Sequence, residues 1–341
     1  MLSSGIFHAL NSKTKNLKGK MLSKNNFKDI INLATVQDIA NYLALNTYYS
    51  NAFKGHNVTD LNREKIEILL NLQFAKYMSK FRNYLSGDYK SLLEALFIKY
   101  EVNDLKTIIR GIFLNKNKDD IRKLISYKCE LNNLNYDSLI ECNSIEELFE
   151  KLKNTIYKNH IKGTFNHIDN EGLFNVEMSL DIAYYSKVRH VLVRIKDSDF
   201  MKKILGIECD LLNLLWIYRS KKYYSLSPEL IFNYTIYDRY KFTSSSIKRL
   251  CYSKNLEEFQ LNMPKDYADL IDIGRDDFKN ELTVFSYRQK EIKKITKGNE
   301  IDFATIFSFL ELYKIEIDMI VSILECKRYN HDIADLYDLL N

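Results

Sequence analysis

Apolar residues return at helical spacing along most of this chain. Ile66, Leu69, Leu70 and Phe74 follow this period inside a stretch that covers residues 62–85, and polar residues occupy the other faces. A period near 3.6 residues is that of an amphipathic helix with one face on a core. The chain also has only two prolines and ten glycines in 341 residues, too few turn residues for a hairpin-rich fold. We therefore predict an all-α fold.

Capping residues predict several helix starts. Thr35 is followed three residues later by Asp38, and Ser144 by Glu147, which is the spacing of a capping box. Pro228 fits the first turn of a helix, where its missing N–H is harmless. We expect helices to begin at these three places.

Three other segments give helix predictions without such caps. At the N-terminus we predict a short helix over residues 6–10, followed by a basic connection. Residues 234–240 alternate briefly in polarity, but Asp238, Arg239 and the flanking sequence favour a helix there. Residues 303–326 form the most hydrophobic of the long helices that we expect.

The most informative long-range feature is a pattern that recurs three times, about every 109 residues. An apolar helical stretch ends each time at a tyrosine: Tyr48, Tyr157 and Tyr267. An acid three residues before an apolar side chain follows it: Glu67, Glu177 and Glu281. A second acid opens a closing landmark: Glu101, Asp210 and Asp318. A cation ends that landmark: Arg110, Arg219 and Lys327.

This order predicts three similar helical units. We place them at residues 1–118, 119–227 and 228–341, each of a size that can bury its own core. Three such bundles suggest a pseudo-symmetric body of approximately threefold shape. That shape is unusual for an enzyme and natural for an adaptor around an axis.

The charge of the chain is mild and well mixed. Fifty basic and 45 acidic residues give a formal net charge of +5, which is not the concentrated basic face of a nucleic-acid binder. Four of the N-terminal lysines are candidates for contacts with a partner: Lys13, Lys15, Lys18 and Lys20. The five cysteines are far apart in the sequence, which favours a reducing compartment over a disulfide framework. No apolar run is long enough to predict a transmembrane helix.

Motifs for catalysis or cofactor binding are absent from the sequence. No glycine-rich loop precedes a Lys-Ser or Lys-Thr pair, and no two glycines have the spacing of a dinucleotide fingerprint. The six histidines are scattered, and the adjacent acids would point in different directions on a helix. We therefore expect no catalytic residue, no cofactor and no metal site.

The landmark charges have two interpretations. Each acid is nine residues from its cation, so the two would lie on opposite sides of one helix and could not pair. One interpretation is that the acids lie toward helix N-termini and the cations toward C-termini, where the helix dipole favours them. The other is that Arg110, Arg219 and Lys327 form a ring of cations that contacts a partner.

Five segments of the chain, in their order and spacing, match a known pattern. They are 20–23 (KMLS), 45–48 (LNTY), 100–111 (YEVNDLKTIIRG), 208–214 (ECDLLNL) and 309–317 (FLELYKIEI). Through these segments the chain resembles, over essentially its whole length, the C/AC39 family of the V/A-type (vacuolar/archaeal-type) ATPases. This family occurs in bacterial and archaeal pumps and in eukaryotic vacuolar pumps.

The resemblance implies a function as well as a fold. Members of the family are funnel-like, all-helical, non-catalytic bodies with three pseudo-symmetric parts. They lie on the cytoplasmic side of the membrane, on the rotor ring of ion-carrying subunits, and receive the foot of the central shaft. This chain would then be a peripheral membrane protein that supports ATP-linked transport of protons or sodium ions, touching the membrane only through the ring.

Two other interpretations fit the residues alone. The chain could be a helical scaffold or adaptor of another complex, or a basic helical protein that binds nucleic acid through its N-terminal lysines. Salt-sensitive binding of DNA or RNA that is lost on removal of residues 1–28 would favour the nucleic-acid hypothesis. Comigration with a rotary ATPase would favour the pump component.

Overall fold

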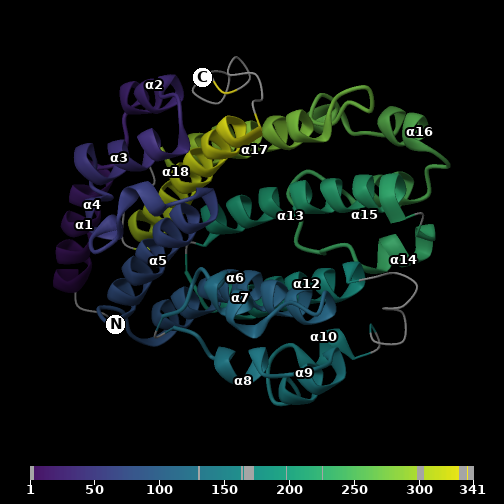
Figure 1. Cartoon of the computed structure of the whole chain (residues 1–341). Helices are drawn as coiled ribbons and strands as arrows, with labels where there is room; N and C mark the ends of the chain where they lie inside the picture. The colour runs from purple at the N-terminus through teal and green to yellow at the C-terminus, as the bar shows by residue number, and fades with distance from the viewer. Residues whose placement is uncertain are drawn as a thin grey trace. The chain divides into compact units, whose positions relative to one another are not determined.

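The fold is known from a computed structural model, which describes residues 4–129, 131–162, 164, 173–196, 198–224, 226–297, 303–329 and 336. These residues form α-helices joined by turns and short helical turns, and they include no strand (Figure 1). The prediction of an all-α fold is confirmed.

The helices vary from single turns to long rods. In chain order they are α1 (Ser4–Lys18), α2 (Lys24–Asn32), α3 (Val36–Asn46), α4 (Ser50–Phe53), α5 (Arg63–Arg82), α6 (Gly87–Phe113), α7 (Lys118–Lys123), α8 (Tyr136–Ile140), α9 (Ile145–Lys151), α10 (Lys158–Ile161), α12 (Phe174–Leu192), α13 (Asp199–Arg219), α14 (Pro228–Asn233), α15 (Ser244–Cys251), α16 (Leu256–Leu261), α17 (Asp277–Thr296) and α18 (Phe303–Tyr329). We call α6, α13 and α18 the closing helices, because each contains one of the closing landmarks.

The predicted helix starts are confirmed. Thr35 caps α3: its hydroxyl accepts from the Asp38 N–H, and the Asp38 carboxylate accepts from the Thr35 N–H. The Ser144 hydroxyl accepts from the Glu147 N–H at the start of α9. Ser227 caps α14, with proline in the first turn. Local capping chemistry therefore sets these boundaries.

Two local predictions are wrong. The first helix is not confined to residues 6–10: α1 runs on to Lys18, so Lys13, Lys15 and Lys18 lie on a helix and not in a connection. Residues 235–243 are not helical. Four of their backbone N–H groups bind side chains of α13, as described below. Tertiary contacts thus replace local helical hydrogen bonds there.

The chain divides into two compact units. Unit 1 contains residues 1–107, 117–135 and 292–341, and unit 2 contains residues 108–116 and 136–291. Unit 1 therefore joins the first part of the chain to the last. The boundaries at 118/119 and 227/228 inferred from the repeats stay a prediction.

Unit 1 is built around α18. This helix packs against α1, α3 and α5, and Figure 1 shows it beside α5. Tyr313 of α18 lies at the centre of an aromatic cluster, with ring centroids 5.8 Å from Phe74, 5.5 Å from Tyr77 and 5.5 Å from Phe309. Such ring pairs add to the stabilisation from burial alone.

Unit 2 is built around α12 and α13. Helix α10 packs against α12, and α15 packs against both α13 and α14. Gly206 on α13 permits a close approach of the chain: a Cβ there would lie 3.1 Å from the Cβ of Tyr240 and 3.2 Å from its backbone nitrogen. A glycine at this position lets residues 239–240 lie directly on the helix.

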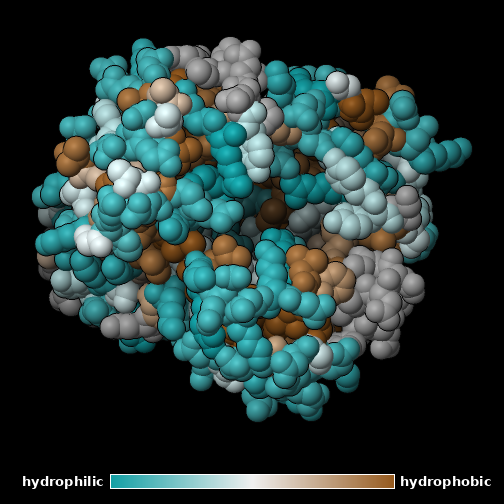
Figure 2. Space-filling model, viewed as in Figure 1, coloured by the Kyte–Doolittle hydropathy of each residue, from teal (hydrophilic) through white to brown (hydrophobic). Residues whose placement is uncertain are grey.

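The surface is mainly polar. On the face that Figure 2 shows, hydrophilic residues predominate and hydrophobic residues occur in small groups among them. The most exposed large apolar side chains are Leu45, Val193 and Leu261, each at least 80% exposed. Among the described helices, none is both long enough and apolar enough to cross a membrane.

Candidate functional site

A buried carboxylate in the middle of α13 holds the chain that follows it. Asp210 is fully buried and accepts from the Tyr267 hydroxyl at 2.6 Å. It also accepts from three consecutive backbone N–H groups: Tyr240 (3.2 Å), Lys241 (2.7 Å) and Phe242 (3.2 Å). One turn on, the Asn213 side chain exchanges two hydrogen bonds with the backbone of Ile236, at 2.8 and 3.0 Å.

The electrostatics of this site follow from burial. Burial raises the pKa of Asp210, and the hydrogen bonds from Tyr267 and the backbone N–H groups oppose that rise. Burial and the nearby Asp210 charge both raise the pKa of Tyr267. The phenol therefore keeps its proton and remains a donor to the carboxylate.

The first closing helix makes the same kind of contact. Glu101 of α6 accepts from the Asn133 N–H at 2.6 Å. Asp104 accepts from the N–H groups of Ser126 (2.8 Å) and Tyr127 (2.9 Å). The sequence separation of Asp104 and Asn213 equals that of their donors Tyr127 and Ile236. These two contacts, one on α6 and one on α13, therefore have the same spacing along the chain.

The third closing helix binds the beginning of the chain. Glu316 of α18 is 3% exposed and accepts from the Leu22 N–H at 2.6 Å and the Tyr49 hydroxyl at 2.8 Å. The Tyr48 hydroxyl also donates to it. Burial raises the pKa of Glu316 to about 7, and the bonds from Tyr48, Tyr49 and Leu22 reduce that rise. Glu316 lies two residues before Asp318, the acid that the sequence pattern marked.

We call these three arrangements the clasps: Glu101 and Asp104 on α6, Asp210 and Asn213 on α13, and Glu316 on α18. In each, an acid on a closing helix holds backbone or tyrosine groups from another part of the chain. The first two hold the segment that follows their own helix, and the third holds the N-terminal segment. Tyr48 and Tyr267, two of the repeated tyrosines, donate to clasp acids.

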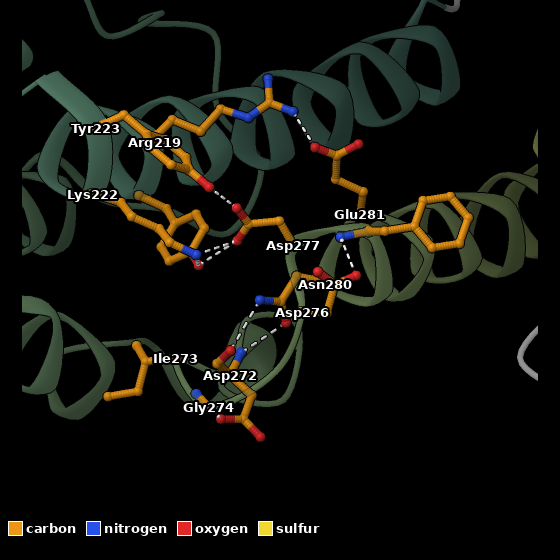
Figure 3. A network of polar contacts seen from close by, with 12 residues as sticks. Arg219, Lys222, Tyr223, Asp272, Ile273, Gly274, Asp276, Asp277, Asn280 and Glu281 are labelled. Atoms are coloured by element: carbon orange, nitrogen blue, oxygen red, sulfur yellow. Dashed lines mark hydrogen bonds and ion pairs between the residues drawn. The ribbon is translucent and has the colours of Figure 1, made fainter. Parts of the chain in front are cut away.

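Two of the three landmark cations, Arg110 and Arg219, form ion pairs with the repeated acids Glu177 and Glu281. Arg110 makes two bonds to Glu177 of α12, at 2.6 and 2.5 Å. Arg219 pairs with Glu281 of α17 (Figure 3). The third pair uses Arg328, the neighbour of Lys327, with Glu64 of α5 at 3.7 Å. Each of these three arginines therefore pairs with an acid from a different helix, but Arg328 and Glu64 are not themselves residues of the repeat.

Figure 3 shows that the Arg219 pair belongs to a larger network at the end of α13. A π-helical turn, Ser220–Tyr224, follows the helix. Its Lys222 and Tyr223, together with Tyr218, donate to Asp277 in the first turn of α17. Burial acts to raise the pKa of Asp277, but the bonds from Lys222 and Tyr218 prevail and lower it. The end of α13 is thereby fastened to the start of α17.

These positions correct the helix-dipole interpretation of the landmarks. The cations do lie in the last turns of their helices. The acids do not lie at N-termini: Glu101 and Asp210 are in the middle of α6 and α13, where they accept hydrogen bonds from other segments. The pairing of cations with Glu177 and Glu281 was not foreseen, because sequence spacing does not reveal contacts between helices. Whether the three cations also contact a partner stays a prediction.

The N-terminal lysines are on or next to α1. Lys13 borders a surface cavity of about 450 Å³ between α1 and α5, together with Leu17, Tyr77, Lys80 and Phe81. Its Nζ donates to the Tyr84 hydroxyl at 3.3 Å and lies 4.7 Å from the centre of that ring. Lys15 and Lys18 are in the last turn of α1. Lys20 lies two residues after the last residue of α1 and is exposed. The aromatic part of this surface, Tyr77 and Phe81, comes from α5, and the sequence around the lysines gives no signal for it.

A charge swap separates the internal role of a landmark cation from a partner role. Arg219→Glu is expected to lower the free energy of unfolding by about 1 kcal/mol, because it places two acids together at a half-exposed site. Adding Glu281→Arg is expected to restore that stability by rebuilding the pair in reverse. Urea unfolding of the two single variants and the double variant checks this. Full additivity of the two single effects would contradict the pairing.

The fold and these contacts define the class of protein. It is an all-helical protein in which the charged residues described above form hydrogen bonds and ion pairs between segments of the same chain. Comparison with known families gives a more particular result. The model of the family described as ATP synthase (C/AC39) subunit matches residues 10–336, so the chain belongs to that family. It is therefore one of the subunits of a V/A-type ATPase. A search of curated proteins found no match.

Proposed function

We propose that this chain is the non-catalytic central-stalk subunit that connects the central shaft of a rotary V/A-type ATPase to the membrane rotor ring. In that place it couples rotation of the shaft to rotation of the ring, and so supports ATP-linked transport of protons or sodium ions. The observation that carries the proposal is the family match over residues 10–336.

The clasps support a mechanical role. A protein that transmits torque needs a body that does not deform between its two attachment surfaces. Asp104, Asp210 and Glu316 are buried acids that each bind two or more donors, and they resist sliding of one helix past another because any shift leaves polar groups unpaired. Glu208 adds a further buried tie in unit 2, with Arg288 at 2.5 Å. Rigidity of this kind fits a coupling element.

We further propose that the body contains three pseudo-symmetric units in a funnel-like arrangement. Each third of the chain has a short capped helix, then a buried tyrosine, a long helix and a closing helix. The short helices are α3, α9 and α16, the long ones α5, α12 and α17, and the closing ones α6, α13 and α18. This recurrence supports the boundaries at residues 118/119 and 227/228.

The proposed partners are the shaft subunits and the ion-carrying subunits of the ring. Candidate contacts are the landmark cations Arg110, Arg219 and Lys327 and the N-terminal lysines Lys13, Lys15, Lys18 and Lys20. Exposed apolar residues at helix ends, Leu45 and Leu261, are further candidates. The chain would be a peripheral membrane protein on the cytoplasmic side, held at the membrane through the ring.

Isolation of the complex tests the association. A tagged chain expressed in its own source is expected to copurify with both shaft and ring subunits, and to stay with the ring when the shaft is stripped. The Arg219→Glu/Glu281→Arg chain serves as a matched variant, since it keeps the net charge and the internal pair. Loss of copurification by this folded variant would identify Arg219 as a partner contact. Failure of the unmodified chain to copurify with any rotary ATPase would refute the proposal.

A further inference from the structure

Unit 2 contains a surface cavity that the proposed function does not use. It has a volume of about 410 Å³ and lies between α12, α13 and residues 237–239. Its apolar wall includes Val188, Leu192 and Leu205, all at least 94% buried. Binding sites for small molecules have volumes of this order and are mostly apolar, with a few polar groups that orient the ligand.

One polar group in the wall has no hydrogen-bond partner among the residues that the structure describes. The side chain of Tyr185 lines the cavity and is almost fully buried, and its hydroxyl makes no hydrogen bond to the described residues. Burial raises the pKa of Tyr185 well above its ordinary value, so the hydroxyl stays protonated and able to donate. A buried hydroxyl without a partner is unfavourable, and a ligand acceptor would relieve it.

The rim of the cavity carries more positive than negative charge. Arg189, Lys202 and Arg239 line it, against the single acid Asp238. Asp238 is already neutralised by Arg189, at 3.7 Å. Arg239 donates to the Tyr237 carbonyl (3.1 Å) and the Ser244 hydroxyl (2.9 Å), and Lys202 donates to Asp199 (3.2 Å). The hydrogen bonds of Arg239 go to neutral oxygens, although its charge also acts on Asp238. With Asp199 included, the three cations Arg189, Lys202 and Arg239 face two acids, which leaves one positive charge in excess at the rim.

We propose that this cavity binds a small anionic amphiphile, with its apolar body against Val188, Leu192 and Leu205, its anionic group at Lys202 and Arg239, and an acceptor atom at the Tyr185 hydroxyl. The shared chemistry is one carboxylate or phosphate joined to a short apolar chain. This site is separate from the proposed mechanical role and does not depend on it.

Titration of the purified full-length chain with octanoate, followed by calorimetry, tests the proposal. We expect one saturable site. Octanol, which has the same chain without charge, is expected to bind at least about tenfold more weakly, because it lacks the attraction to the rim cations. Lys202→Gln should weaken octanoate binding about threefold. Lys203→Gln is the matched control, since this neighbouring exposed lysine does not line the cavity and its loss should leave binding unchanged.

Tyr185→Phe separates a ligand role from a structural one. The free variant should melt at the same temperature as the unmodified chain or higher, since the hydroxyl has no hydrogen bond to the described part of the chain to lose, whereas its octanoate affinity should fall about threefold to tenfold. Absence of saturable octanoate binding would overturn the proposal, as would equal affinity for octanol. Unchanged affinity in both Lys202→Gln and Tyr185→Phe would also overturn it. Binding only to vesicles of anionic phospholipid, with none to octanoate, would indicate adsorption to a membrane surface and refute the cavity.

Discussion

Replacing Asp210 with alanine is expected to lower the free energy of unfolding by about 4 kcal/mol. The substitution removes the acceptor for three backbone N–H groups and for the Tyr267 hydroxyl, all within 3.2 Å of the carboxylate. The site is fully buried, and each buried donor that is left without an acceptor costs about 1–3 kcal/mol when water cannot replace its partner. Some relaxation of residues 240–242 keeps the total below the sum of these terms.

Urea unfolding measures this effect, and Asp199→Ala is the matched control. Asp199 is on the same helix, but its side chain is 90% exposed and contacts only the side chain of Lys202 among the bonds described above. Its removal should change stability by less than about 1 kcal/mol. Similar small losses in both variants would show that the Asp210 clasp does not hold residues 240–242.

The stability that Glu316 contributes is expected to fall as pH rises. Its pKa is about 7 in the folded chain, against 4.5 for an unperturbed glutamate, because burial disfavours the charged form. The native state therefore binds the proton more tightly than the unfolded state between these values. The linkage relation then gives a loss of stability from about pH 4.5 up to about pH 7 and no further change above. At about 1.4 kcal/mol per pKa unit, the total change is about 3 kcal/mol.

The difference between the unmodified chain and Glu316→Gln isolates this titration. Groups that titrate in both chains contribute equally to both stability curves and cancel in the difference. The free energy of unfolding of the unmodified chain should therefore fall by about 3 kcal/mol relative to that of the variant across this pH range. Tyr49→Phe removes a hydrogen bond that lowers the pKa of Glu316, so it should move the upper end of the transition to higher pH. Parallel stability curves for the unmodified chain and Glu316→Gln would contradict the assignment.

Much of the fold follows from local sequence signals. Caps at Thr35, Ser144 and Ser227 and the long apolar period of α5 and α18 could be identified from sequence, because they depend on neighbours within one helix. The non-helical conformation of residues 235–243 could not be predicted from sequence, because backbone groups in this segment bind Asp210 and Asn213 of α13. No local pattern reports such distant acceptors.

The candidate site was predicted only in part. The repeat marked Glu101 and Asp210 as special, but it suggested a dipole role and not a clasp. In α18 the pattern pointed to Asp318, whereas the acid that binds the tyrosines is Glu316; Asp318 instead pairs with Lys314 at 2.8 Å. Spacing along the chain identifies residues that share a role. It does not reveal which segment each residue contacts.

We propose that this protein couples ATP hydrolysis by the rotary ATPase to ion movement across the membrane. The most direct test uses membrane vesicles that contain the ATPase with or without this chain, and measures ATP hydrolysis and ATP-driven ion uptake in the same preparation. We predict that vesicles without the chain lose ion uptake while the catalytic subunits still hydrolyse ATP, and that adding the purified chain restores uptake. Ion uptake that is unchanged without the chain would contradict the account.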